Sequence, residues 1–290
     1  MANGIIIVDK PSDWTSHDVV AKLRRHFGER RIGHAGTLDP MATGVLPIFV
    51  GRATRAVSFA ADGDKEYLAG LRLGLVTDTQ DITGNILQET HCAFTLEEIE
   101  AVLDNFRGEI AQIPPMYSAI KQQGKKLYEL ARAGQEVHRE PRPVTIHRLD
   151  LLEQTSPTDF FLRVTCSKGT YIRTLCHDIG QRLGVGGCLY TLRRTRVSDF
   201  PVADAYTLPE ILAHPNPQEL LRPVDTCFAS YAPLEVSADH EKKIRNGMQI
   251  PTDAPEGTYR VYSQDGHRFL MLGHVNDHSL ITIKSFFEVN

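Results

Sequence analysis

Residues 31–44 read Arg-Ile-Gly-His-Ala-Gly-Thr-Leu-Asp-Pro-Met-Ala-Thr-Gly, and this stretch decides how we expect the first part of the chain to fold. Its three glycines permit backbone angles that other residues resist, and Pro40 pushes Asp39 toward an extended conformation. The apolar run 45–50 that follows is typical of a buried strand. We therefore expect the Asp39 carboxylate on a fixed turn outside regular structure, immediately before a strand.

Asp39 is the only acidic residue between Glu29 and Asp62, and four arginines precede it at positions 24, 25, 30 and 31. An anionic partner could therefore approach the turn without strong local repulsion. A rigid turn suits a nucleophile. The alternative for an isolated Asp-Pro pair is an Asx turn, in which the Asp39 side chain bonds its own backbone.

The 290 residues are 41% hydrophobic and 23% charged, which is enough for one large domain plus a small one. No apolar run is long enough for a signal peptide or a membrane span, so we expect a cytoplasmic protein. The five cysteines are odd in number and form no Cys-x-x-Cys pair, which indicates neither a disulfide framework nor a zinc site. We interpret them as reduced thiols of the core.

Charge is unevenly distributed along the chain. The formal net charge is -4, and an acidic protein of this kind usually lacks the basic surface that binds phosphates. However, residues 21–35, 121–148 and 163–196 carry net charges of +4, +4 and +6, so the remainder carries -18. This segregation predicts a basic face on an acidic body, although basic runs are also common on solvated surfaces that bind nothing.

Hydrophobic periodicity indicates alternating strands and helices as far as residue 200, hence an α+β fold with a mixed sheet and packed helices. Thr15 with Asp18, and Thr95 with Glu98, are typical of capping boxes at two helix starts, and Gly28 of a helix end. The expected strands are 4–8, 45–50, 65–73, 144–152, 160–167 and 190–198, and the expected helices are 16–27, 95–106 and 170–183.

Two regions differ from the rest of the chain in composition and hydrophobic periodicity. Residues 112–148 combine four prolines with seven Lys and Arg and show little apolar periodicity, which predicts an insertion with a short helix. Tyr117 and Tyr128 could stack bases there. Residues from about 231 onward read as short strands separated by turn signals at Asn246-Gly247, 265–266 and 276–277, which suits a small barrel-like β domain.

Further motifs stand in order along the chain. They are residues 4–11 (GIIIVDKP), 15–20 (TSHDVV), the Asp39 stretch, 65–67 (KEY), Gly74, 77–79 (TDT), Asp81, Gly84 and 166–173 (CSKGTYIR). With these motifs the chain resembles the bacterial TruB family, the tRNA pseudouridine synthases that act on the T-loop uridine at position 55. The match runs from about Gly4 to about Phe200, and two positions depart from the pattern: Asp13 stands where Gly is frequent, and Ala35 where Thr is common.

The resemblance implies a pseudouridine-synthase catalytic domain over residues 1–228 and a PUA-like RNA-binding domain over residues 229–290. Residues 112–148 would be the basic thumb that grips RNA. The reaction requires neither a metal nor an organic cofactor. The implied partner is the T-arm stem-loop of tRNA, with no protein partner and no membrane, and we expect a monomer because no heptad or apolar stripe stands out.

The resemblance also assigns roles to single residues. Asp39 would be the nucleophile or base, by adding to the uracil ring, attacking C1′ or removing a proton from C2′; the sequence leaves these routes open. Tyr67 would receive the flipped base and could take the proton from C5. Arg173 would be the cation that orients Asp39 and keeps it charged. By composition alone, Tyr67 is an ordinary strand aromatic and Arg173 a surface arginine.

Three further residues are assigned to the substrate by the same resemblance. Tyr171 would hydrogen-bond the nucleotide, Leu192 would contact the base, and His34 would contact RNA near it, although each could be an ordinary core or surface residue. Lys10 and Pro11 would support the active loop, with Lys10 paired to a carboxylate or a phosphate.

Two other classes of function stay open. A non-catalytic RNA-binding or tRNA-folding protein could use the same basic face. A glycosidase-like hydrolase could use Asp39, but it needs a second carboxylic acid about 5 Å away. The loop offers no acidic partner of its own, although a distant residue could fold in.

Overall fold

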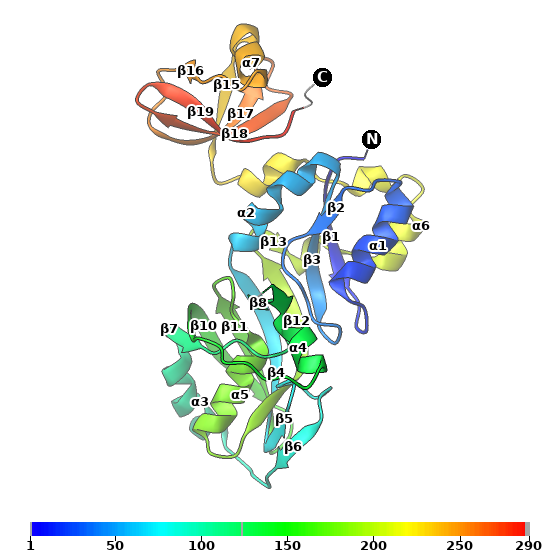
Figure 1. Cartoon of the computed structure of the whole chain (residues 1–290), viewed down its shortest axis with the longest axis vertical. Helices are drawn as coiled ribbons and strands as arrows, with labels where there is room; N and C mark the ends of the chain where they lie inside the picture. Colours follow the sequence, from blue (N-terminus) through cyan, green and yellow to red (C-terminus); the bar gives the residue numbers. More distant parts are fainter. Residues whose placement is uncertain (1, 123, 288–290) are drawn as a thin grey trace.

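A computed structural model of the chain describes residues 2–122 and 124–287 (Figure 1). A mixed ten-stranded sheet runs through most of the elongated molecule, and a separate five-stranded sheet forms the end that contains the C-terminal residues. The expected α+β class, with a mixed sheet, flanking helices and a β-rich C-terminal unit, is confirmed.

The large sheet joins segments that are far apart in the sequence. Its strands follow the order β14-β1-β3-β12-β4-β11-β10-β7, with β2 added on β3 and β13 on β12. Strand β12 therefore lies between β3, which leaves the Asp39 loop, and β4, which carries Tyr67. The strands are β1 (Gly4–Lys10), β2 (Ile32–His34), β3 (Thr43–Val50), β4 (Lys65–Leu73), β7 (Gly108–Gln112), β10 (Arg142–Gln154), β11 (Asp159–Cys166), β12 (Gly187–Val197), β13 (Phe200–Pro201) and β14 (Tyr206–Thr207).

Both faces of strand β1 are covered, which fits its run of apolar residues from Ile5 to Val8. Ile6 and Val8 pack with helices α1 and α6, whereas Ile5 and Ile7 pack toward the segment that contains α2. The helices on the two faces are α1 (Ser16–Phe27), α2 (Val57–Asp62) and α6 (Leu208–Ala213), and 3-10 turns occupy Gly51–Ala56, Val202–Asp204, Pro217–Leu220 and Val224–Phe228.

The expected helix ends at residues 16–27 are confirmed. Thr15 and Asp18 form a capping box, and Gly28 ends α1 in a left-handed conformation with φ of 62°. The other half of the sheet is covered by two helices whose apolar residues share one core with β4, β10, β11 and β12. These helices are α3 (Leu96–Leu103), which is followed by a 3-10 turn at Asp104–Phe106, and α5 (Ile172–Arg182).

The basic excursion is shorter than expected. It leaves the large sheet after β7 and returns at β10, so it occupies residues 113–141 and not 112–148. The last seven residues of the expected range belong to β10, where Val144 and Ile146 are buried in alternation. The excursion contains the strands β8 (Lys121–Gln122) and β9 (Lys125–Lys126) and the short helix α4 (Leu127–Arg132), while a further hairpin elsewhere pairs β5 (Leu75–Thr77) with β6 (Ile86–Glu89).

The C-terminal unit contains a helix that the turn signals did not predict. Asn246-Gly247 ends helix α7 (Ala238–Arg245) and is not a hairpin turn, because Asn246 and Gly247 donate to the last carbonyls of that helix. The two later signals do lie at hairpins between neighbouring strands. The strands of this unit are β15 (Ala232–Val236), β16 (Ile250–Pro251), β17 (Gly257–Ser263), β18 (Phe269–Asn276) and β19 (Ser279–Ser285).

Aromatic side chains join the C-terminal unit to the large sheet. The ring of Phe228 lies 5.2 Å from Phe59, 6.0 Å from Phe269 and 5.6 Å from Phe286, measured between ring centroids. The hydroxyl of Tyr262 also donates to the Asp225 carboxylate at 2.6 Å, and this bond together with burial raises the pKa of Tyr262 to about 12. None of the helices in the described part of the chain is long and apolar enough to cross a membrane.

Candidate active site

The loop that carries Asp39 joins β2 to β3, and its backbone is held from two sides. The Leu38 amide donates to Ser16 Oγ at 2.9 Å, and that hydroxyl lies 3.2 Å from the Leu38 carbonyl oxygen. The Asp13 amide donates to the Pro40 carbonyl at 2.9 Å, from a left-handed backbone with φ of 65°. The expectation of a fixed turn outside regular structure is confirmed.

Lys10 supports this loop in a way that the sequence did not reveal. Its side chain is fully buried, and its Nζ donates to the carbonyl oxygens of Pro11 at 2.8 Å, Trp14 at 2.6 Å and Pro40 at 3.1 Å. Burial lowers the pKa of Lys10 to about 8. Lys10 does not pair with a carboxylate as expected: all three acceptors are backbone carbonyls, which leaves Asp39 for another cation. A pairing of Lys10 with a phosphate stays a prediction.

That cation is Arg173, on the first turn of α5. Its Nε lies 2.9 Å from Asp39 Oδ2, and its Nη2 lies 3.4 Å from Oδ1, so the guanidinium meets the carboxylate with two nitrogens. Arg173 is 5% exposed, whereas the side chain of Asp39 is 37% exposed. The arginine is therefore fixed inside the fold, and the carboxylate stays open to a reacting molecule.

The same guanidinium contacts a second carboxylate that the loop sequence did not predict. Asp81 Oδ2 lies 3.8 Å from Arg173 Nη1, and Asp81 Oδ1 accepts hydrogen bonds from the hydroxyls of Thr79 and Thr83. Arg173 also donates to the carbonyl oxygens of Thr79 at 2.9 Å and of Tyr117 at 2.8 Å. Asp81 stood among the family motifs, but only the fold brings it to the arginine of Asp39.

Tyr67 lies in the core beside the Asp39 loop. Its side chain is 8% exposed and belongs to the same buried cluster as Leu38 and Leu192, which is 6% exposed. Burial raises the pKa of the Tyr67 hydroxyl, and the nearby guanidinium of Arg194 acts in the opposite direction. Strand β4 thus places an aromatic ring and strand β12 an apolar side chain in the same cluster as the residue preceding Asp39.

Arg194 is a site residue that sequence reasoning missed. It is 1% exposed, its Nε donates to the Val45 carbonyl at 2.7 Å, and its Nη2 donates to the Gly36 carbonyl at 3.0 Å. It is also the cross-strand partner of Tyr67 in the sheet. The signal was present in the run Arg-Arg-Thr-Arg at 193–196, but that run contributed only to a count of surface charge.

Tyr171 precedes α5 and is held by its backbone. Its amide donates to Gln112 Oε1 at 3.0 Å, and Gln112 Nε2 donates to its carbonyl at 3.2 Å. Burial raises the pKa of the Tyr171 hydroxyl. Tyr171 is half-buried, and its bonds to Gln112 tie it to the end of β7, where the basic excursion begins.

His34 ends β2, at the entrance to the Asp39 loop. Its ring meets the ring of His17 edge to face with centroids 5.5 Å apart, and its Nδ1 is a buried atom without a hydrogen-bond partner. Burial, together with the charges of His17 and Arg194, lowers the pKa of His34 to about 4. The imidazole is therefore neutral near pH 7.

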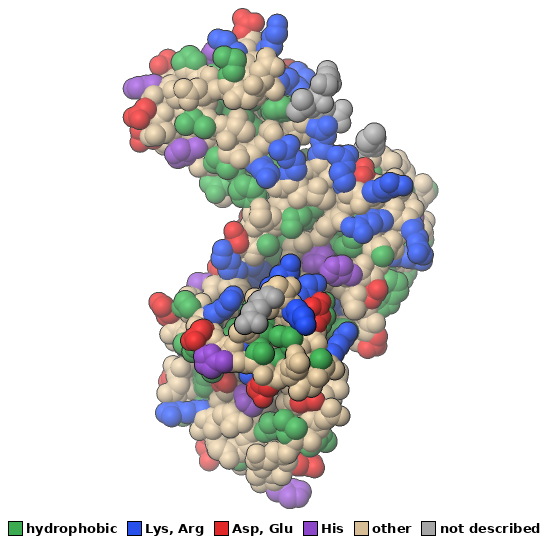
Figure 2. Space-filling model, in the orientation of Figure 1, with side chains coloured by type: hydrophobic (Ala, Val, Ile, Leu, Met, Phe, Trp, Pro, Cys, Tyr) green, Lys and Arg blue, Asp and Glu red, His purple; other side chains and the backbone are tan. Residues whose placement is uncertain are grey.

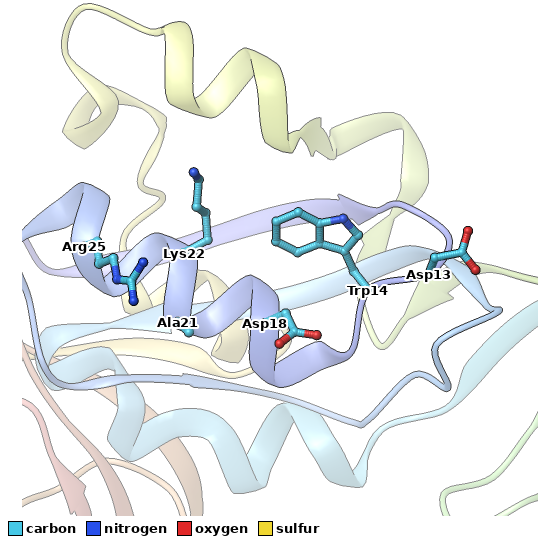
Figure 3. A pocket seen from close by; sticks show the side chains of 6 residues that line it. All are labelled: Asp13, Trp14, Asp18, Ala21, Lys22 and Arg25. Atoms are coloured by element: carbon cyan, nitrogen blue, oxygen red, sulfur yellow. The ribbon is translucent and has the colours of Figure 1, made fainter.

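A shallow hollow lies along α1, next to the Asp39 loop (Figure 3). Trp14 and Lys22 point to the same side of the helix in this view. The hollow shares Asp13 with the loop contacts described above, but Asp39 does not line it. Its lining residues are Asp13, Trp14, Asp18, Ala21, Lys22 and Arg25. Among the described residues, no group of His, Cys, Asp and Glu side chains could hold a metal ion.

Basic side chains gather on one face of the molecule. Figure 2 shows Lys and Arg over the region of α1 and around the region of α4, with acidic side chains interspersed. In the excursion, Lys126 Nζ lies 5.3 Å and the Arg132 guanidinium 5.5 Å from the centroid of the Tyr128 ring. Cations therefore already contact the aromatic ring that the sequence offered for base stacking.

Two family models match consecutive parts of the chain. The model described as "TruB family pseudouridylate synthase (N terminal domain)" matches residues 24–172. The model described as "tRNA pseudouridylate synthase B C-terminal domain" matches residues 173–229. Together they cover the Asp39 loop, β4, the basic excursion and β12.

Curated proteins are similar over nearly the full length. A tRNA pseudouridine synthase B from an Azoarcus species is 45% identical over 284 residues, which are 97% of this chain and 93% of that protein. The protein of the same name from Clostridium kluyveri is 41% identical over 98% of this chain and 99% of its own length. The one from Escherichia coli is 41% identical over 95% and 92%.

Solved structures share the fold at lower identity. An H/ACA RNP bound to a substrate RNA containing 2′-deoxyuridine includes a chain that superposes with a TM-score of 0.75 at 23% identity, covering 100% of this chain and 86% of that one. A Cbf5-Nop10-Gar1 complex gives the same TM-score at 25% identity, covering 99% and 86%. This likeness extends through the C-terminal unit.

Proposed function

This chain belongs to the TruB family of pseudouridylate synthases, and from that premise we propose that it isomerises uridine 55 in the T-loop of tRNA, with Asp39 as the nucleophile. The coarser activity, pseudouridine synthesis in tRNA, is the one that its relatives are named for. The position of the uridine and the role of Asp39 are the finer parts of the proposal.

One observation supports the role of Asp39 above the others. Its carboxylate is held by two nitrogens of a buried arginine yet is 37% exposed, on a loop whose backbone is fixed by Lys10, Asp13 and Ser16. A nucleophile needs this combination, because it must be charged, oriented and reachable at once. An Asx turn, the alternative for this residue, would direct the carboxylate to its own backbone.

The reaction breaks the bond between ribose C1′ and uracil N1 and forms a bond between C1′ and C5. The C5 proton is lost and N1 gains one, so no redox change occurs and no group is carried away. Asp39 acts by adding to the ring, by attacking C1′ or by removing the C2′ proton. The buried guanidinium of Arg173 orients the carboxylate in each of these routes.

The remaining residues of the site receive the nucleotide. A T-loop uridine must leave its stack to meet Asp39, and an aromatic ring is a common platform for a flipped base, which is the role we give Tyr67. Its hydroxyl is the candidate acceptor of the C5 proton. Leu192 supplies apolar contact to the base, and Tyr171 and His34 contact the nucleotide and the neighbouring RNA.

Two regions outside the site would hold the RNA. The excursion at 113–141 carries the lysines at 121, 125 and 126 and lies against the site through the Tyr117 carbonyl, so we assign it the thumb role expected for residues 112–148. We assign RNA contact also to the C-terminal unit, residues 229–290, as the PUA-like domain. The bound element would be the T-arm stem-loop, recognised by one copy of the chain.

Tritium release from C5-labelled uridine in an unmodified T-arm stem-loop tests the proposal. We expect release by the native protein and none with Asp39→Asn or with cytidine at the target position. Asp150→Asn is a matched control, because this carboxylate lies on β10 and pairs with Arg148. Release should be unchanged in that variant.

The same experiment separates synthesis from binding alone. RNA affinity measured by filter binding should survive Asp39→Asn, because the basic surfaces are untouched. A native protein that binds the stem-loop and releases no label would instead be an RNA-binding or tRNA-folding protein. Loss of both affinity and release in Asp39→Asn would contradict the separate roles given to the loop and to the basic face.

A further inference from the structure

Arg194 is the largest side chain that the described fold buries completely. No Asp or Glu in the described ranges forms an ion pair with it, so its charge is balanced only by dipoles and by more distant groups. Burial alone lowers the pKa of this arginine, while Tyr67 and Asp39 act in the opposite direction. A buried guanidinium without a carboxylate partner is costly, and such groups are retained where they have a task.

The task is visible in the acceptors that Arg194 contacts. They lie on two different elements: Val45 on β3 and Gly36 in the Asp39 loop. In the sheet, Arg194 is paired with Tyr67 on one side and with Gly44 on the other. Its side chain therefore ties the loop that carries the carboxylate to β3, next to the strand that carries Tyr67.

Two glycines of the Asp39 stretch leave room for this arginine. A Cβ atom on Gly44 would lie 2.2 Å from the Arg194 carbonyl oxygen, and one on Gly36 would lie 3.3 Å from Arg194 Nη1. Both glycines also have positive φ, of 102° and 82°. The glycines that mark the motif in the sequence thus allow close packing of the loop and β3 against Arg194.

The guanidinium also acts on the Tyr67 hydroxyl. Its positive charge opposes the rise that burial causes in the pKa of that hydroxyl. Arg194 therefore stabilises any negative charge that develops on the phenolic oxygen.

We propose that Arg194 is a positioning residue for the isomerisation, which holds the Asp39 loop against β3 next to Tyr67, its partner in the sheet. It does not touch the substrate, because its side chain is 1% exposed. This inference rests on the proposed function, since it concerns the same reaction, but it adds a residue to which neither the sequence motifs nor the loop geometry gave a role.

Two substitutions test the role. Arg194→Lys keeps the charge but loses the planar fork that donates to the Val45 and Gly36 carbonyls from two separate nitrogens. Arg194→Met removes the charge as well. At saturating stem-loop, we expect the single-turnover rate of tritium release to fall about 10-fold for lysine and about 100-fold for methionine, the range for loss of hydrogen bonds to a charged group. RNA affinity should stay within about twofold, because Arg194 is buried away from RNA.

The matched control is Arg193→Gln on the same strand. Arg193 pairs with Asp9 at 2.7 Å and is 39% exposed, and it has no contact with Tyr67 or Gly36 among its hydrogen bonds. The rate should be unchanged in this variant. Arg194→Lys retains a buried cation that can donate to the same carbonyls, so it serves as the folded variant if methionine destabilises the core.

A second readout does not depend on activity. With 3-fluorotyrosine in place of the nine tyrosines, the fluorine resonance of Tyr67 can be assigned through Tyr67→Phe. We expect that resonance to move in Arg194→Lys and to stay in place in Arg193→Gln, with the other tyrosines unaffected. A purely structural role for Arg194 would instead shift many resonances together.

The outcomes separate the two proposals. The native protein could be active while its Arg194→Lys variant keeps both the native rate and the native Tyr67 resonance. That result overturns the positioning role of Arg194 and leaves the proposed synthase function standing. A native protein that releases no label overturns the proposed function; the position of the Tyr67 resonance in Arg194→Lys then decides whether Arg194 acts on the tyrosine.

Discussion

Replacing Arg173 by methionine removes the guanidinium that holds Asp39. In the native structure this group meets Asp39 with two nitrogens, lies 3.8 Å from Asp81 and donates to the carbonyl oxygens of Thr79 and Tyr117. Arg173→Met would leave two carboxylates without this cation and two carbonyls without a donor. We therefore expect losses of both stability and activity.

The size of the stability loss follows from burial. Removing one partner of a buried ion pair costs about 3–5 kcal/mol. Arg173 is 5% exposed, but Asp39 is 37% exposed, so water can solvate part of the carboxylate that is left behind. We therefore expect Arg173→Met to lower the free energy of unfolding by about 2–4 kcal/mol. The rate of pseudouridine formation should fall at least about 100-fold, because an unoriented carboxylate no longer meets the nucleotide.

A double-mutant cycle measures the pair itself. Urea unfolding followed by circular dichroism would compare the native protein, Arg173→Met, Asp39→Asn and the double variant. Because the neutral amide introduced by Asp39→Asn no longer needs a cation, the second substitution should recover part of the loss, with a coupling of about 1–3 kcal/mol. Arg182→Met on the exposed side of α5 is the control and should change stability by less than about 0.5 kcal/mol. Strict additivity of the two single losses would refute the claim that Arg173 and Asp39 stabilise each other.

Three more predictions concern the loop, the glycines and the excursion. Burial lowers the pKa of His34 from 6.5 to about 4, so between these pH values the folded state binds fewer protons than the unfolded state. Stability should therefore fall as the pH drops from 6.5 to about 4, and in thermal melts the melting temperature of His34→Gln should fall less over the same range. Gly44→Ala should lower the free energy of unfolding in urea by at least about 3 kcal/mol, because the new Cβ meets the backbone of β12. The control Gly28→Ala has nothing within 4 Å of its new Cβ and should cost about 1 kcal/mol. Equal costs would contradict the close approach of Gly44 to β12. Lys125→Ala should weaken binding of the T-arm stem-loop and reduce the slope of log affinity against log salt by about 0.7–0.9, one phosphate contact, and an unchanged slope would remove this lysine from the RNA surface.

Local signals predicted much of the fold because the forces that they report are local. The capping boxes at Thr15 and Thr95 and the left-handed end at Gly28 satisfy backbone groups within a few residues, so the sequence alone places those helix ends. The alternation at 65–73 predicts β4 to the residue, because side chains of a strand take opposite faces in turn.

The errors have equally physical causes. Helix α7 was missed because its mean hydropathy is low and because Asn-Gly is also a common hairpin turn. Whether Asn-Gly ends a helix or forms a hairpin depends on which carbonyls its amides bond, and the sequence does not show this. The excursion was expected to extend to residue 148, because charge was read along the chain while Val144 and Ile146 already alternate as part of β10.

The site shows the same division. Arg173, Tyr67 and Asp39 were identified as candidates by their motifs, and the structure brings them close to one another, although their roles remain proposals. Arg194 was not identified, and Asp81 was named only as a family motif without a role, because a charged residue within a basic run, or within a Thr-rich loop, has no sequence signature of burial. Their importance comes from contacts across about 100 residues or more of chain, which only the strand order creates.

The sequence by itself determined the local elements, the turn of Asp39 and the residue types available for chemistry, because backbone sterics, capping and hydrophobic periodicity act over a few residues. The tertiary structure alone decided which cation holds which group: Lys10 takes three carbonyls, Arg173 takes Asp39, and Arg194 takes the Val45 and Gly36 carbonyls. A buried charge is stable only when polar groups lie within reach of it, and the strand order of the sheet determines which groups those are. Here the position of β12 between β3 and β4 determines the partners.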